Sequence, residues 1–166
     1  MNKIKRFFKH LTATRWQVLQ CFPAHSMRTI KEAIQASETG HMGELRFAVE
    51  AGLDPAQILA GTTSRERALQ IFSLLRVWDT EHNSGVLIYL LLADHKVEIV
   101  ADRGIHARVG VAGWSAICRE MESKFRQGAF ESGVLQGVEE ISALLQQHFP
   151  AHPHNPNELP DQPAVL

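Results

Sequence analysis

The chain has 166 residues, which is enough for one domain with its own core and a short extension at either end. Hydrophobic residues make up 45% and charged residues 21%, a composition typical of globular proteins rather than of disordered or fibrous ones. The net charge of −1 argues against a nucleic-acid-binding protein, and two cysteines are too few for a disulfide scaffold. The longest apolar stretch, residues 85–93, is far shorter than the roughly 20 residues of a membrane-spanning helix.

Charge is distributed unevenly along the chain. The first 31 residues hold seven basic and no acidic residues, whereas the remaining 135 hold ten basic and 18 acidic ones. Residues 1–22 are expected to form a basic amphipathic arm, because apolar residues recur there at helical spacing beside lysines and an arginine. The residues expected to contact a membrane or a partner are Lys5, Arg6, Phe7, Phe8 and Lys9.

Three environments suit such an arm. It can lie on an anionic membrane surface, pack on a partner protein, or pack on its own domain with the lysines in water. No secretory signal pattern follows the charged residues, so we expect a cytoplasmic protein, peripheral at the inner face of the membrane if the arm binds lipid.

The first half of the body predicts two helices around one strand. A helix over residues 26–40 has Ser26 as its N-cap. Residues 44–50 alternate between apolar and charged side chains, the pattern of a half-buried strand. A second helix begins near Ser64 and carries its apolar positions as far as Val77 or Trp78.

The second half predicts a hairpin followed by two helices. Residues 86–92 are aliphatic on both faces, as in a strand covered on two sides, and residues 97–101 alternate. The turn at Asp94 and His95 makes these two strands antiparallel. A helix that contains Trp114 and Phe125 comes next, and a last helix spans residues 130–149.

These elements predict an α/β fold, a three-layer α/β/α sandwich around a small mixed sheet with a β-hairpin. A strand–helix–strand unit favours a right-handed parallel crossover, so the first strand is expected to run parallel to the second. The domain is expected to cover residues 23–150. Five prolines in the last 17 residues predict an extended tail over residues 151–166, either draped on the body or free.

This topology brings three separated loops to one edge of the sheet, here called the rim. The starts of the first two strands and the end of the third lie there. Carboxylate, amide and hydroxyl oxygens suit a hard divalent cation such as calcium or magnesium, which in turn can hold a phosphate. The expected cation ligands are Asp79, Asp102, Glu38, Glu81 and Asn83, and the expected phosphate contacts are Arg103 and Thr80. The alternative is structural: Asp79 caps a helix end or loop, and residues 102–103 form a turn with a surface ion pair.

Three segments of the chain carry a resemblance to a known family. They are SETGHMGELRFAVE, LLRVWDTEHNSGVLIYLLLADHKVEIVADRGI, and the pattern W-x-x-I-C-x-x-M-x-x-x-F-x-x-G that precedes LLQQHFP. Through these segments residues 38–149 resemble the TPM domain family, a phosphatase-like family named for thylakoid-lumen, photosystem-assembly and receptor-auxiliary members. The NELPDQP tail resembles that of a compact, soluble bacterial subgroup.

The resemblance implies an α/β/α sandwich and two kinds of function. Some members have acid phosphatase activity and bind divalent metals; others are accessory or assembly factors at membranes. The family's loops correspond to residues 79–85 and 102–104, and the exported precursor and membrane anchor of longer members are not expected here. The sequence therefore predicts a cation-binding accessory module near a membrane or partner protein. The alternative is a metal-dependent acid-phosphatase-like hydrolase of phosphate monoesters, for which the sequence offers no evident nucleophile or tuned base.

Overall fold

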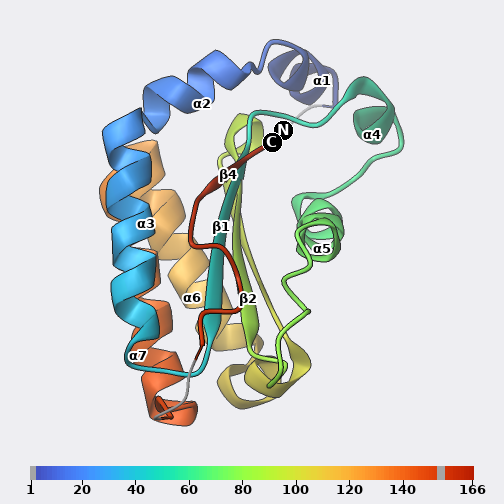
Figure 1. Cartoon of the computed structure of the whole chain (residues 1–166). Coiled ribbons are helices and arrows are strands. Elements are labelled where there is room, and N and C mark those ends of the chain that lie inside the picture. Colours follow the sequence, from blue (N-terminus) through green and yellow to red (C-terminus); the bar gives the residue numbers. More distant parts are fainter. Residues whose placement is uncertain (1–2, 153–155) are drawn as a thin grey trace.

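The computed structural model describes residues 3–152 and 156–166. Its elements, in chain order, are α1 (Lys3–Leu11), α2 (Arg15–Cys21), α3 (Ala24–Glu38), β1 (Glu44–Glu50), α4 (Pro55–Leu59), α5 (Ser64–Leu74), β2 (Gly85–Leu91), the 3₁₀ turn η1 (Leu92–Asp94), β3 (Lys96–Ala101), α6 (Arg103–Arg126), α7 (Phe130–His148) and β4 (Ala164–Val165). Helices α3, α6 and α7 cover one face of the sheet, and α5 covers the other (Figure 1). The predicted three-layer α/β/α sandwich is confirmed.

The strands lie in the order β3-β2-β1-β4 among the described residues. β1 pairs parallel with β2, and β2 pairs antiparallel with β3, as predicted. β4 was not predicted, and it adds to β1 in parallel through two residue pairs. The tail that leads into β4 lies against the body, where Leu159 and Asp161 are buried. Of the predicted tail, residues 153–155 lie outside the described part of the chain.

The prediction of a half-buried β1 was wrong, because all seven of its residues are buried. Its charged face is covered by α5 and by the C-terminal tail, and each charged side chain finds a partner there. The Glu50 carboxylate lies 2.7 Å from Arg67 Nη2 of α5. The Glu44 carboxylate accepts the Leu159 N–H, and Arg46 donates to the Gln162 carbonyl. Alternation of charge along β1 therefore marks buried ion pairs and hydrogen bonds rather than exposure to water.

Two helix boundaries also differ from the prediction. α3 begins at Ala24 after Pro23, so Ser26 is a buried residue in the first turn and not the N-cap. α5 begins at Ser64 as predicted, but it ends at Leu74. Arg76 has a φ of 53°, which turns the chain out of the helix and places Val77 in the core beyond it.

Candidate functional site

The rim forms as the topology predicted. Glu44 at the start of β1 donates its backbone N–H to the Ser84 carbonyl, at 3.0 Å, and Asp102 after β3 donates its own to the Gly85 carbonyl, at 2.9 Å. The loop before β2 thus lies between the start of β1 and the end of β3. The fold brings residues from three separated segments to one end of the sheet.

The exposed carboxylates of the loop before β2 already have partners or face water. The Asp79 carboxylate lies 2.8 Å from Arg76 Nη2, in an exposed pair three residues apart. Glu81 is exposed, and its backbone N–H donates to both carboxylate oxygens of Glu158, a tail residue that the sequence prediction missed. Within residues 3–152 and 156–166, no three Asp, Glu, His or Cys side chains lie close enough to hold one metal ion.

Glu38 is buried and lies beneath the start of β1. Its carboxyl group accepts the Leu45 N–H at 2.8 Å. The pKa of Glu38 is raised to about 9, mainly by burial. The neighbouring Glu44 and Asp161 carboxyl groups add to this effect, and the backbone hydrogen bond from Leu45 opposes it. A carboxyl group with this pKa is protonated near neutral pH, so Glu38 offers a cation no negative charge.

Asp102 and Ser84 are the rim residues with unused polar atoms. Asp102 Oδ2 and Ser84 Oγ are buried and have no hydrogen-bond partner among the described residues. Burial raises the pKa of Asp102, and backbone hydrogen bonds at Gly85 and Arg103 oppose that effect. A buried oxygen with no protein partner is uncommon in a folded protein, and an ordered water, a cation or another polar group can satisfy such an atom.

The three other predicted rim residues are Thr80, Asn83 and Arg103. Thr80 forms a local hydrogen bond with the backbone, and the other two side chains are exposed. Thr80 Oγ1 accepts the Ser84 N–H at 2.9 Å. Asn83 is exposed with a φ of 51°, a left-handed conformation that asparagine tolerates better than most residues. Arg103 is exposed at the first position of α6.

The arm is docked on the opposite end of the sheet. Arg6 donates to the Asp94 carboxylate, at 2.9 Å from Nη2, and to the Thr62 carbonyl. His10 is buried, accepts the Leu53 N–H through Nδ1 and places Nε2 3.0 Å from Asp94. Burial alone would raise the pKa of Asp94, but the hydrogen bonds from Arg6 and His10 outweigh it and lower that pKa. Arg6 therefore binds the body of the protein, while Lys5, Phe8 and Lys9 stay exposed.

Large apolar side chains are exposed to water on α1, α2 and α4, which lie at the same end of the molecule (Figure 1). Phe7 is half-buried and shares a shallow apolar cavity of about 270 Å³ with Ile4, Ile58 and Leu59, which joins α1 to α4. The exposed members of this apolar surface are Ile4, Phe8, Leu11, Trp16, Leu19 and Leu59. In the described part of the chain, every helix is too short or too polar to cross a bilayer.

Comparison with known proteins decides the family. A family model described as the TPM domain matches residues 20–144. This chain belongs to the TPM domain family. The match includes all three rim loops, whereas α1 and most of α2 precede it. No curated protein matches the chain.

Two solved structures share the TPM fold of this chain. The BA42 protein of the psychrophilic bacterium Bizionia argentinensis, solved by NMR, is 27% identical with a TM-score of 0.74; the match covers 87% of this chain and 95% of BA42. The N-terminal domain of a P. gingivalis protein is 17% identical with a TM-score of 0.61, covering 86% of this chain and 95% of that domain. The second likeness bears on the fold alone.

Proposed function

We propose that this TPM domain is a non-catalytic accessory module that binds an anionic membrane surface through α1, α2 and α4. The observation that carries the proposal is the apolar surface of these helices, together with the exposed lysines Lys5 and Lys9 in α1. Large apolar side chains beside basic ones are typical of helices that lie in the interface of an anionic bilayer.

The way the arm is held supports this function. Arg6 and His10 fix the inner face of α1 to Asp94, so the outer face is already ordered before any partner is met. Binding then costs little conformational entropy. Basic residues near an anionic leaflet contribute about 1 kcal/mol each, and the acidic residues lie beyond the first 31.

The geometry also orients the domain. The arm contacts η1, which follows β2, whereas the rim lies where β1 and β2 begin. With the apolar surface on the membrane, the acidic rim faces away from the lipid and remains open to ligands.

Vesicle sedimentation tests the proposal. The protein is expected to sediment with phosphatidylserine-containing vesicles and to bind pure phosphatidylcholine far less. The Phe8→Ser/Trp16→Ser variant is expected to bind about tenfold more weakly, because two exposed apolar side chains no longer enter the interface.

The matched control is Leu69→Ser/Leu74→Ser, which removes two comparably exposed apolar residues from α5. Its vesicle binding should equal that of the unchanged protein. Equal loss in both double variants, or no sedimentation of the unchanged protein, rejects the membrane function and leaves a protein partner as the alternative for this surface.

The rim supports a second candidate function, cation binding with or without phosphate ester hydrolysis. Its support is the buried Asp102 Oδ2 and Ser84 Oγ atoms, which lack partners among the described residues. A cation there would be coordinated by Asp102, the Asn83 amide, the Thr80 hydroxyl and water, and not by all four of the carboxylates predicted from the sequence. That set does not gather within residues 3–152 and 156–166.

Calorimetric titration with calcium, magnesium and manganese tests the rim. Asp102→Asn is expected to abolish cation binding, whereas Asp79→Asn should leave it nearly unchanged because Asp79 already pairs with Arg76. Phosphate release from p-nitrophenyl phosphate in the same samples would favour the hydrolase. The absence of heat with all three cations would end the cation hypothesis.

A further inference from the structure

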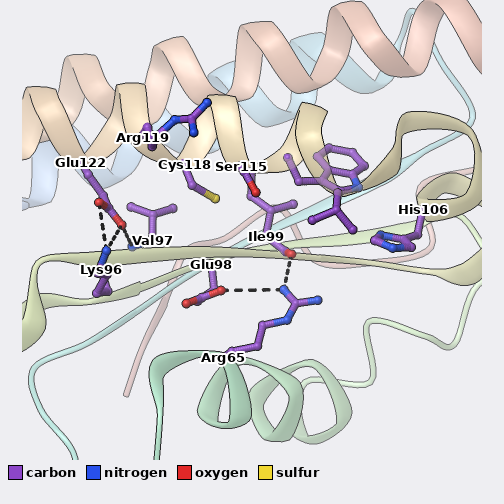
Figure 2. Close-up of a pocket in the computed structure, with 12 residues that line it drawn as sticks. Arg65, Lys96, Val97, Glu98, Ile99, His106, Ser115, Cys118, Arg119 and Glu122 are labelled. Atoms are coloured by element: carbon purple, nitrogen blue, oxygen red, sulfur yellow. Dashed lines mark hydrogen bonds and ion pairs between the residues drawn. The ribbon is translucent and has the colours of Figure 1, made fainter.

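The outer edge of β3 is closed by side chains instead of a further strand. β3 pairs with β2 on one side, and among the described residues no strand lies on the other. There Glu122 of α6 accepts the Val97 N–H, and Arg65 Nη1 of α5 donates to the Ile99 carbonyl at 2.6 Å. Between these side chains the edge forms one wall of a groove of about 490 Å³, which α5 and α6 complete (Figure 2).

The walls of this groove are mostly apolar. Val97 and Ile99 line it from the strand, and Val111, Trp114 and Cys118 line it from α6. Figure 2 shows Arg65 reaching from α5 to Ile99, while Cys118 points to the strand from α6. Burial raises the pKa of the Cys118 thiol to about 11, so this cysteine is a neutral wall residue and not a nucleophile. A groove of this size can hold a small molecule whose apolar part packs on these walls.

The groove also holds hydrogen-bond donors without acceptors. Trp114 is 4% exposed, and its Nε1 is buried without a partner in the described part of the chain. The indole N–H can only donate, so it requires an acceptor. His106 and Arg119 line the same groove, and the side chain of neither forms a hydrogen bond or ion pair with another described residue.

The two carboxylates of the groove are already engaged. Glu98 accepts from Ser64 at 2.6 Å and lies 3.9 Å from Arg65. Glu122 pairs with Lys96 at 3.2 Å and accepts the Val97 N–H. The groups that remain without an acceptor are the Trp114 indole N–H and the side chains of His106 and Arg119. A ligand with a negatively charged acceptor group would complement them.

The break in α6 adds to this positive character. Gly110 has a φ of 73° and a ψ of 168°, outside the helical range, so residues 111–126 form a helical segment of their own. Val111 and Trp114 belong to its first turn and face the groove. The N-terminal end of a helix carries partial positive charge and favours an anion.

We propose that this groove binds a small molecule with a flat apolar body and a carboxylate or phosphate group. The anionic group accepts the Trp114 indole N–H and a hydrogen bond from His106, beside the positive charge of Arg119. The apolar body packs on Val97 and Ile99. This site is separate from the membrane-binding surface and does not depend on it.

NMR titration of the full chain tests the site with two probes, 1-naphthyl phosphate and 1-naphthoate. The chain has three tryptophans, and Trp16 and Trp78 are exposed, so their indole N–H signals report on other surfaces. The Trp114 signal is expected to shift with at least one probe at a Kd below about 1 mM, while the other two signals stay in place. The probe that binds with the higher affinity shows whether the site prefers a phosphate or a carboxylate group. The neutral naphthalene-1-methanol should bind about tenfold more weakly, since it lacks the charge.

Three variants separate binding from folding. Trp114→Phe keeps the apolar wall and removes the donor, so the affinity for the anionic probes should fall about tenfold. Trp78→Phe is the matched control and should bind normally. Should Trp114→Phe fail to fold, Ser115→Phe fills the groove from an exposed position of α6 and is expected to abolish binding. Shifts confined to Trp16 or Trp78, equal affinity for the neutral probe, or no binding by the unchanged protein would each overturn the proposal.

Discussion

Replacing Arg67 with methionine is expected to lower the free energy of unfolding by about 3 kcal/mol, as measured by urea denaturation. Arg67 donates to both carboxylate oxygens of Glu50, at 2.7 Å from Nη2 and 2.9 Å from Nε. The Tyr89 hydroxyl donates to the same carboxylate from β2. Burial, and next to it the Glu50 carboxylate, raise the pKa of Tyr89, so the phenol remains a donor. Methionine would leave a buried carboxylate with only this neutral hydroxyl as its partner.

The double variant Arg67→Met/Glu50→Gln is the informative comparison. The amide oxygen of the introduced glutamine can still accept from Tyr89, and no buried charge remains, so most of the lost stability should return. Arg76→Met serves as the control, because the Arg76–Asp79 pair is mostly exposed and worth at most about 1 kcal/mol. If the double variant is as unstable as Arg67→Met alone, the buried carboxylate is not the source of the cost.

The buried cluster of Glu50, Arg67 and Tyr89 also shows which parts of the fold the sequence could predict. Local periodicity predicts the hairpin and the last two helices, because the residues that pack their faces lie a few positions apart. The burial of β1 depends on distant partners: Arg67 on the next long helix, and Leu159 and Gln162 in the tail. A charged residue every second position looks the same whether its partner is water or a side chain from another element. β4 was missed for a related reason, since two residues in a proline-rich tail carry no strand pattern of their own.

The candidate site likewise has a part that the sequence predicts and a part that it does not. Strand topology brings the loops at the rim together, and topology follows from the order of elements. The direction of each side chain does not follow from that order. Asp79 pairs with Arg76, and Glu38 accepts the Leu45 N–H. Likewise, helical spacing indicates the apolar face of α1 but not that Arg6 binds Asp94. Trp16, Leu19 and Leu59 join the apolar surface only because the fold places α2 and α4 at the same end of the molecule as α1 (Figure 1).

Replacing Glu38 with glutamine is expected to stabilise the protein increasingly as the pH rises. The folded-state pKa of Glu38 is about 9, above the roughly 4.3 of an unfolded chain, so the folded state holds a proton that the unfolded state releases. The stability contributed by Glu38 is therefore complete below about pH 4.3 and is lost as the pH rises towards about 9. Glutamine retains an oxygen for the Leu45 N–H and an NH₂ donor for Asp161, and it has no proton to release.

Urea denaturation at about pH 5 and about pH 8 measures this effect. The free energy of unfolding of Glu38→Gln, relative to that of the unchanged protein, should rise by about 3 kcal/mol from the lower pH to the higher. Glu32→Gln, an exposed change on the same helix, should follow the unchanged protein at both pH values. Asp161→Asn should weaken the pH dependence, since the Asp161 carboxylate helps to hold the proton on Glu38. Parallel pH profiles for Glu38→Gln and the unchanged protein would mean that Glu38 is charged when folded, and would return it to the set of possible cation ligands at the rim.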